Sequence, residues 1–313
     1  MARLPEPKRL VVPPIPNGWY FHSYKILLGN NLAVVTTDID LIADFEDDRT
    51  QNTARRAWKL ASDAAAKIWI VYEDQLVESL AFELIEPFPI VEQFVDGRWL
   101  VANSRSSGDG NVRIFRPNGS QARRIELGDG IAHIKIDQQG RIWVGWFDEG
   151  ALGNDHWKPA GHASPPSAHG IAAFDSHGNL LEAATSHSII DCYALNVFRN
   201  EAWACPYTDF PIWSFQDGTE RTRATKLIGT SAIAIKDDFL LAAGGYNEDK
   251  NRLFLLKLAN GTTEMYGRWR LPLEHKAGTY RTYLDGRGDE IHLVKKNEWL
   301  CWRVEDFVSS YRD

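Results

Sequence analysis

A hairpin that recurs along the chain restricts the fold more than any other feature of the sequence. Each copy has an apolar segment, a short turn containing Gly, Asn or Asp, and a second apolar segment, as in AHIKIDQQGRIWVGW at 132–146. These turn residues tolerate positive φ and close β-hairpins, and the flanking Ile, Val, Leu, Trp and Tyr favour strands. Similar segments are YKILLGNNLAVVTT, IVEQFVDGRWLVAN, CYALNVFRNEAWACPY, SAIAIKDDFLLAAGG and YRTYLDGRGDEIHLVKK. The chain is therefore expected to consist of repeated antiparallel strands.

A second, more polar hairpin lies between these copies, for example NVRIFRPNGSQARRIEL and GIAAFDSHGNLLEAA. Its stricter alternation of apolar and polar residues is typical of outer strands with one face in water. The unit thus has four strands, and four-stranded units repeated about every 40 residues predict a β-propeller. The second strands of the units are expected to centre on Val34, Leu100, Val144, Trp203, Leu241 and His292.

Six such units predict an all-β, six-bladed β-propeller that forms a single domain over residues 1–313. Seven blades are the alternative if residues 38–86 contain another unit. The last unit shows three clear strands, so we expect the N-terminal KRLVV to supply the fourth and close the ring. Closure removes the free sheet edges that the first and last blades would otherwise expose.

One blade motif also resembles known propellers. The pattern D-x-x-G-x-I-W-V-G runs from Asp137 to Gly145 and resembles the repeats of NHL-type and two-component-regulator propellers. The stretch IWVGWFDEG is similar to one in uncharacterised bacterial propeller proteins. The resemblance covers about 20 residues; it implies the fold and no activity.

The expected insertions all fall after second strands. They span 38–66, 103–111, 147–169 and 244–251, whereas the turns on the opposite side stay short, as in DQQG and PNGS. In a propeller, connections after second strands and between blades open on one rim. Loops lengthen where function lies, so the sequence predicts a functional surface on this rim.

Composition excludes several classes of function. The net charge of -7 and the pI near 5.7 argue against a general nucleic-acid binder, which needs a basic surface. No apolar run reaches the length of a membrane span, and prolines interrupt the N-terminus where a signal peptide would lie. The three cysteines lie in apolar strands, which predicts buried thiols and a reducing cytoplasm. Twelve Trp residues suit packing between sheets. We expect a monomer.

The insertion in blade 1 combines an acidic run with a helical pattern. DIDLIADFEDD is expected to be a solvated loop or a docking surface for a basic partner. Ala54, Trp58, Ala61 and Ala65 then recur at helical spacing, which predicts a short helix on the rim. This helix is either a lid packed by Trp58 or a partner-binding element that uses Arg55 and Arg56.

The blade 3 insertion begins with two carboxylates, Asp148 and Glu149. Its Gly, Pro and Ser content predicts an irregular folded-over loop. Each carboxylate either caps backbone N–H groups or pairs with an Arg of a neighbouring blade, or the pair lines the channel mouth and binds a cation. The histidines of the loop, His156, His162 and His169, lack the spacing typical of a zinc site.

We expect a non-catalytic, cofactor-free propeller that binds another protein, for example a basic one, and acts by occluding its surface, as an immunity protein does. The candidate contacts are Arg55, Arg56, Arg105, Trp146, Asp148, Glu149, Trp157 and Tyr246. The alternative is a hydrolase or lyase of the gluconolactonase or strictosidine-synthase type with a metal at the channel mouth. Its candidate residues are Asn103, His133, Asp148, Glu149 and Asp191, and His187 is a further acid–base candidate.

Overall fold

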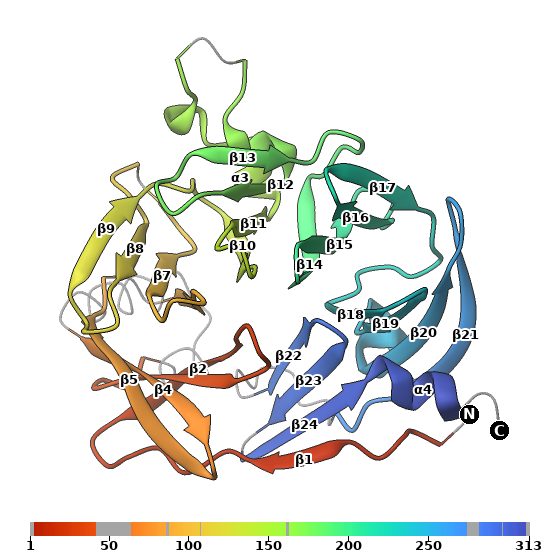
Figure 1. The fold of residues 1–313 in the computed structure, drawn as a ribbon, viewed down its shortest axis with the longest axis horizontal. Coiled ribbons are helices and arrows are strands. Elements are labelled where there is room, and N and C mark those ends of the chain that lie inside the picture. Colours follow the sequence, from red (N-terminus) through yellow and green to blue (C-terminus); the bar gives the residue numbers. More distant parts are fainter. Residues whose placement is uncertain are drawn as a thin grey trace.

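Six four-stranded antiparallel sheets form a closed ring (Figure 1). The computed structural model describes residues 3–41, 64–85, 88–106, 108–160, 163–273, 282–295 and 297–310. Blades 1 to 5 take their strands in chain order, β2–β5, β6–β9, β10–β13, β14–β17 and β18–β21. Blade 6 contains β22, β23, β24 and β1. The prediction of six blades is confirmed.

The innermost strands are β2 (Tyr20–Ile26), β6 (Pro89–Gln93), β10 (Ile131–Ile136), β14 (Asp191–Phe198), β18 (Ala232–Lys236) and β22 (Thr282–Arg287). The second strands are β3 (Leu32–Thr37), β7 (Trp99–Asn103), β11 (Ile142–Trp146), β15 (Glu201–Tyr207), β19 (Phe239–Ala243) and β23 (Glu290–Lys295). Each contains the centre predicted for it. These strands are almost wholly buried because sheets cover both of their faces.

The third strands are β4 (Ala65–Tyr72), β8 (Val112–Phe115), β12 (Ile171–Phe174), β16 (Ile212–Gln216), β20 (Arg252–Leu258) and β24 (Glu298–Arg303). The outer strands are β5 (Gln75–Glu83), β9 (Gln121–Ile125), β13 (Leu180–Ala183), β17 (Thr219–Arg223), β21 (Thr263–Arg270) and β1 (Lys8–Val11). The outer strands are the most exposed strands of the blades, as their polar sequences predict, and β9 and β13 are exposed at consecutive residues.

The N-terminal strand closes the ring. Strand β1 pairs antiparallel with β24 from Lys8 opposite Cys301 to Val11 opposite Glu298. The indole N–H of Trp302 donates to the carbonyl of Pro5 at 2.9 Å, which fixes the segment before β1 as well. The predicted role of KRLVV is therefore confirmed, and β24 has no free edge.

Aspartates close the short turns, which explains the blade motif. Asp137 accepts hydrogen bonds from the backbone N–H groups of Gln139 and Arg141, both at 2.9 Å. Its second oxygen accepts from Arg141 Nε at 2.6 Å and from the Trp143 indole at 3.2 Å. Asp175 caps the β12–β13 turn in the same way. One aspartate side chain thus satisfies the hydrogen-bond donors of the whole turn, and the connection can remain short.

Large aromatic side chains fill the spaces between blades. Trp99, Trp143, Trp146, Trp213, Trp269 and Trp302 are almost fully buried. Trp143 packs against Trp213 and Phe215 of the next blade, with ring centroids 6.4 and 5.4 Å apart. The three cysteines are buried and unpaired, as predicted.

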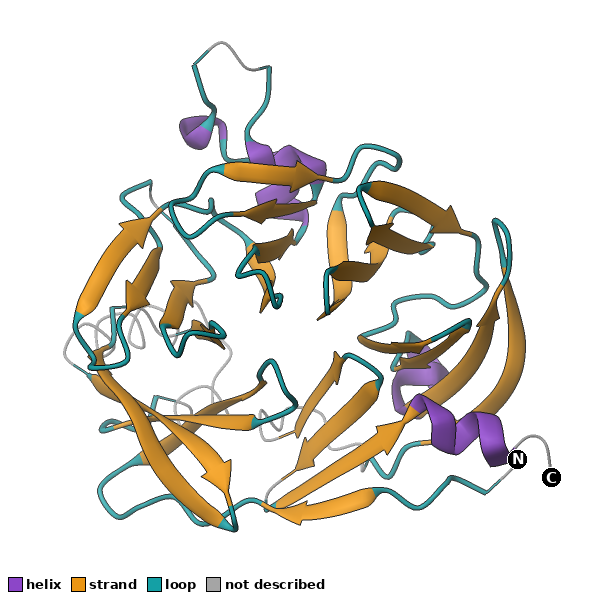
Figure 2. Cartoon of the chain, in the orientation of Figure 1, coloured by secondary structure: helices purple, strands orange, loops and turns teal. Residues whose placement is uncertain are grey.

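Short helices lie outside the sheets (Figure 2). They are α3 (Asp148–Leu152), η1 (Asp155–Trp157), η2 (Pro166–His169), η3 (Asn247–Asn251) and α4 (Val304–Ser310). The prediction of an irregular blade 3 insertion is wrong, because α3, η1 and η2 all lie in it. Acidic residues in the first turn of α3 and Pro166 at the start of η2 favour these helices. The helix predicted for blade 1 lies outside the described residues, except that Ala65 begins β4.

Candidate binding rim

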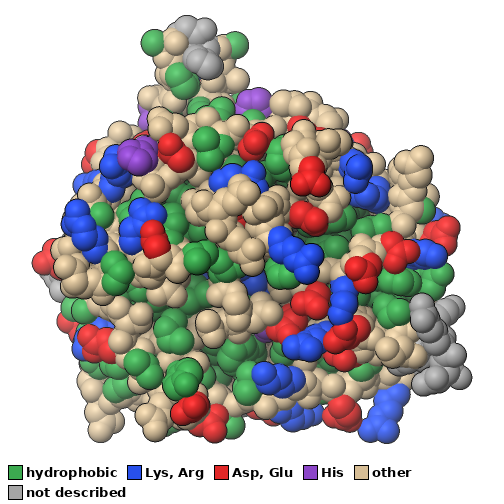
Figure 3. All heavy atoms as spheres, viewed as in Figure 1, with side chains coloured by type: hydrophobic (Ala, Val, Ile, Leu, Met, Phe, Trp, Pro, Cys, Tyr) green, Lys and Arg blue, Asp and Glu red, His purple; other side chains and the backbone are tan. Residues whose placement is uncertain are grey.

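All the long described connections open on one end of the ring, which we call the loop rim. It carries the links between blades and the connections from second to third strands, including 104–111, 147–170 and 244–251. The opposite end, the turn rim, carries short turns such as 137–141, 199–200 and 237–238. The predicted asymmetry between the two rims is confirmed. The face shown in Figure 3 carries acidic and basic side chains interspersed with apolar ones.

Exposed apolar side chains concentrate on the loop rim. Half of the large apolar side chains that are exposed in the described chain lie there: Tyr20, Ile85, Phe88, Leu152, Tyr207, Ile228 and Tyr246. The others are spread over the outer strands, the β1 edge and the turn rim. Leu152, on α3, is 73% exposed. Clustered exposed apolar residues mark contact surfaces.

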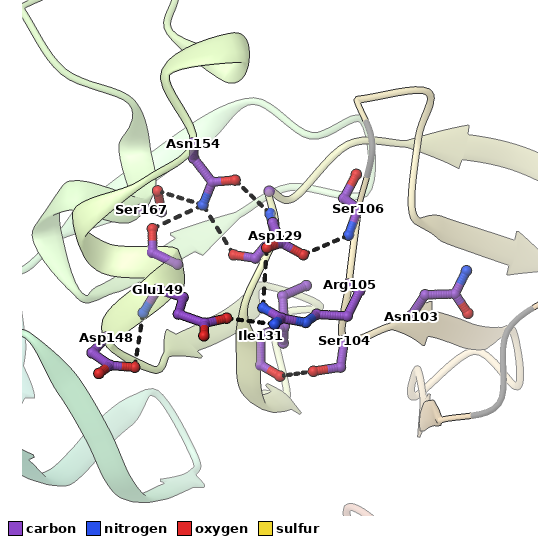
Figure 4. A network of polar contacts seen from close by, with 12 residues as sticks. Asn103, Ser104, Arg105, Ser106, Asp129, Ile131, Asp148, Glu149, Asn154 and Ser167 are labelled. Carbon is purple, nitrogen blue, oxygen red and sulfur yellow. Dashed lines mark hydrogen bonds and ion pairs between the residues drawn. The ribbon is translucent and has the colours of Figure 1, made fainter. Parts of the chain in front are cut away.

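A polar network ties the loops of blades 2 and 3 together (Figure 4). The Arg105 guanidinium pairs with Glu149 and, at 3.1 Å, with Asp129. Asp129 also accepts from the backbone N–H of Ser106 at 2.7 Å. Asn154 accepts from the Asp129 N–H at 2.6 Å and donates to the Gly150 carbonyl at 2.8 Å. The loops of blades 2 and 3 are thus fixed relative to each other.

The two carboxylates of the blade 3 insertion have different surroundings. Glu149 pairs with Arg105 of the neighbouring blade, the structural arrangement considered for it from sequence. Asp148 is the first residue of α3, and its Oδ1 accepts from the N–H of the next residue, Glu149, at 2.9 Å. Its remaining surface is exposed. The structure therefore separates a bridging carboxylate from one that faces solvent.

The two tryptophans proposed as anchors are not equivalent. Trp146 is fully buried and its indole donates to the Leu127 carbonyl at 3.0 Å, so its proposed role as a surface anchor is wrong. Trp157 is half-buried and covers Trp146, with ring centroids 6.2 Å apart. The insertion folds back over the strand end, which removes Trp146 from the surface.

An apolar cavity of about 460 Å³ opens on the loop rim where inner strands of four blades begin. Its walls include Tyr24, Leu41, Phe88, Ile90 and Phe147. A cavity with such walls has room for an apolar side chain or a small ligand. Phe147 directly precedes Asp148, so the cavity and the exposed carboxylate adjoin.

A cluster of four aromatic rings lies on the rim of blades 4 and 5. Phe210 contacts Tyr193, Tyr207 and Tyr246, with ring centroids 5.5, 5.4 and 5.7 Å away. Sequence reasoning found Tyr246 alone. The sequence does place Tyr193 and Tyr207 at the rim ends of β14 and β15, and this position could have indicated the aromatic cluster. Asp191, which begins β14, lies near this cluster and near Asp148.

The ring centre holds charges that pair with one another. Lys135 Nζ contacts Asp285 Oδ2 at 2.6 Å, and Tyr283 Oη donates to the same oxygen at 2.6 Å. Burial lowers the pKa of Lys135 to about 8. Although burial alone raises the pKa of Asp285, the Lys135 and Lys25 charges lower it below its usual range. The pairing indicates a structural role.

The residues proposed for a channel-mouth metal site do not form one ligand set. Among the described residues, the three-ligand group within 4.8 Å consists of Glu290, His292 and Cys301 instead. His292 Nδ1 accepts from the Trp299 indole at 3.2 Å, which leaves the proton on Nε2, the nitrogen that faces Glu290. Arg303 Nε donates to Glu290 at 2.9 Å. Cys301 Sγ also donates to Glu290 at 3.2 Å, so the carboxylate already has two donors and is poorly suited to a cation, whereas His292 Nε2 has no hydrogen-bond partner among the described residues.

The remaining candidates are dispersed. Burial lowers the pKa of His133 to about 4, so it is neutral near pH 7. His169 Nδ1 contacts the Ala184 carbonyl at 2.8 Å and His187 Nε2 the Thr208 carbonyl at 3.0 Å. Asn103 is buried at the end of β7. Arg55, Arg56 and His162 lie outside the described residues.

Comparison with known proteins concerns the fold alone. No family model matches the chain, and no curated protein matches it. Virginiamycin B lyase from Staphylococcus aureus is similar in structure with a TM-score of 0.48 at 11% identity, covering 95% of this chain and 100% of that one. An extracellular domain from B. thetaiotaomicron has a TM-score of 0.49 at 8% identity, covering 91% of this chain and 34% of that one. No helix in the described ranges has the length and apolar character needed to cross a membrane.

Proposed function

We propose that this propeller binds another protein through the loop rim and acts by covering part of that protein's surface. The observation that carries the proposal is that the rim with the long loops also carries seven of the fourteen large apolar side chains that are exposed in the described chain. Neither feature is needed to close the ring, because the turn rim performs the same structural task with short turns.

The loop rim offers the parts that a stable interface uses. Leu152 and Phe88 are exposed apolar residues, and the cavity beside Phe147 can receive an apolar side chain. Interfaces draw most of their affinity from a few such anchors at well-packed positions. The network around Arg105 fixes the α3 loop before binding, so little conformational entropy is lost on association.

The test compares matched substitutions on the two rims. Immobilised protein captures its partner from cells of the source organism, and mass spectrometry identifies it. Calorimetry then measures affinity for wild type, Leu152→Asp on the loop rim and Val95→Asp on the turn rim. The two side chains are 73% and 67% exposed, so both changes place a charge on an already exposed position.

We expect a one-to-one complex that Leu152→Asp weakens at least tenfold and Val95→Asp weakens less than twofold. Phe88→Asp on the loop rim and Tyr72→Asp, at the turn-rim end of β4, form a second matched pair. Equal weakening by both members of each pair would contradict the proposal, as would tight binding by both Leu152→Asp and Phe88→Asp. Circular dichroism checks that each variant is folded.

A further inference from the structure

Two carboxylates on the loop rim have no cationic partner among the residues that the structure describes. Asp148 begins α3 of blade 3 and Asp191 begins β14 of blade 4. Within the described ranges of the chain, neither forms an ion pair of the kind that Asp129, Glu149 and Asp285 form. The strands that carry them are adjacent, because Gly145 of β11 packs directly against Cys192 of β14. Burial and the Asp148 charge raise the pKa of Asp191. The two groups therefore repel each other and would gain from a cation placed between them.

An aromatic surface adjoins this pair. Asp191 lies opposite Tyr207 in the β14–β15 ladder, and Tyr193 lies two positions further along β14 at a β-bulge. Tyr246 donates a hydrogen bond from its hydroxyl to that of Tyr193, and their ring centroids are 5.8 Å apart. Tyr207 and Tyr246 are exposed, whereas Tyr193 and Phe210 support them. Exposed tyrosine faces attract cations.

The backbone that supports this surface has an uncommon conformation. Asp209 and Phe210 both have positive φ, 60° and 50°, in the connection from β15 to β16. Residues other than glycine rarely adopt this conformation, and it is concentrated at functional sites. The connection holds the Phe210 ring against three tyrosines. Glu73 and Asp74 have positive φ in a short turn of the turn rim as well, so the conformation is shared with other turns of the ring.

We propose that Asp148, Asp191 and the Tyr193–Tyr207–Phe210–Tyr246 cluster bind an arginine side chain presented by the partner protein. This inference rests on the proposed function and specifies which chemistry of the partner the loop rim recognises. The unpaired carboxylates supply the countercharge, and the exposed tyrosine faces supply a stacking surface.

Arginine fits this combination better than lysine does. The guanidinium group is planar, so it can stack on an aromatic ring while its N–H groups reach carboxylates at its edge. The lysine ammonium is more strongly hydrated and cannot stack. The apolar cavity adjoins Asp148 through Phe147, so a neighbouring apolar residue of the same partner has a place to bind.

The first test uses a defined probe and does not require the partner. Fluorescence anisotropy measures binding of labelled hexa-arginine and hexa-lysine at low salt. We expect hexa-arginine to bind, and the double variant Asp148→Asn, Asp191→Asn to lose at least tenfold in affinity. The control is Asp74→Asn, Asp217→Asn, which removes the same charge from two exposed turns of the turn rim. Asn tolerates their positive φ, and we expect less than a twofold change.

The second test separates stacking from charge. Tyr246→Leu removes a ring and we expect about a threefold loss of hexa-arginine affinity, whereas Tyr246→Phe keeps the ring and its affinity. Equal binding of hexa-lysine, or equal losses in the two double variants, would overturn the assignment to arginine at this site. If a captured partner is lost with Leu152→Asp but retained by Asp148→Asn, Asp191→Asn, the rim function stands and this inference fails.

Discussion

Two pairs of carboxylates in this propeller have opposite surroundings. Glu92 and Asp285 lie in the ring centre, where Lys25 and Arg287 approach Glu92 at 3.6 Å and Lys135 contacts Asp285 at 2.6 Å. Asp148 and Asp191 lie on the loop rim and have no such partner within the described ranges. The two carboxylates of the ring centre are thus paired with cations of the same chain. The two carboxylates of the rim remain accessible to solvent or to another molecule.

The difference follows from the cost of burial. An unpaired charge in the ring centre would lose its hydration without compensation, so each must have an opposite charge nearby. Asp148 keeps most of its hydration on the rim, and the cost of leaving it unpaired is small. A fold can therefore retain unpaired carboxylates where they still reach solvent, and there they are available to a ligand.

The comparison predicts the largest loss of stability in the ring centre. Lys135→Met leaves Asp285 buried without its nearest cation, and we expect the free energy of unfolding to fall by about 3–5 kcal/mol. Urea denaturation followed by tryptophan fluorescence measures the change. Lys236→Met, which removes the more exposed pair with Glu305, serves as the control and should cost less than about 1 kcal/mol. Similar losses in the two variants would show that the central pairing is not specially important.

A smaller loss is expected at a buried carboxylate that serves a single turn. Asp137→Ala removes the acceptor for two backbone N–H groups, for Arg141 and for the Trp143 indole. We expect a loss of about 2–3 kcal/mol in urea denaturation, because buried donors remain unsatisfied. Asp175→Ala changes a more exposed turn of the same design and should cost about half as much. A larger cost at Asp175 would contradict the role of burial.

Apolar alternation and turn residues predicted the strands and the sides on which their connections lie, because these features depend on neighbouring residues in the sequence. Alternation and turn residues located the centres of all six second strands, and the missing fourth strand of blade 6 pointed to Lys8–Val11. The same reasoning located the loop rim, because connections of antiparallel strands alternate between the two ends of a sheet. These inferences need no knowledge of which blades face one another.

Contacts between distant segments could not be predicted in this way. Lys135 and Asp285 are 150 positions apart, and neither sequence context shows that the other is near. Trp146 looked like a surface anchor because its burial depends on how the following insertion folds back. A five-residue helix such as α3 is too short for periodicity to reveal. The aromatic cluster likewise forms only when β14, β15 and the β19–β20 loop meet.

Glu220 is intermediate between the central and the rim carboxylates, because hydrogen bonds rather than a cation stabilise its charge. It accepts hydrogen bonds from Thr185, Ser186 and Trp213, and these lower its pKa to about 2 although burial opposes the change. Its folded pKa is below the unfolded value, so its stabilisation is present above pH 4.5 and is lost as the pH falls toward 2. Glu220→Gln should cost about 1 kcal/mol at pH 7, after allowance for solvent screening. Denaturation at pH 7 and pH 3 should show the difference shrinking at low pH.

The smallest change in the free energy of unfolding is expected at Asp191, where substitution should stabilise the fold rather than destabilise it. Burial and Asp148 raise its pKa, so the folded state binds a proton more tightly than the unfolded state does. Ionised Asp191 therefore destabilises the fold, and this penalty is absent below the ordinary pKa of 3.8 and develops as the pH rises through the raised value. Asp191→Asn should raise the free energy of unfolding at pH 7 by up to about 0.5 kcal/mol and leave it unchanged at pH 3. Urea denaturation at both pH values measures this, with Asp217→Asn as the control without a carboxylate neighbour. A loss of stability at pH 7 would mean that Asp191 is already neutralised within the chain, and the contrast with the central pair would disappear.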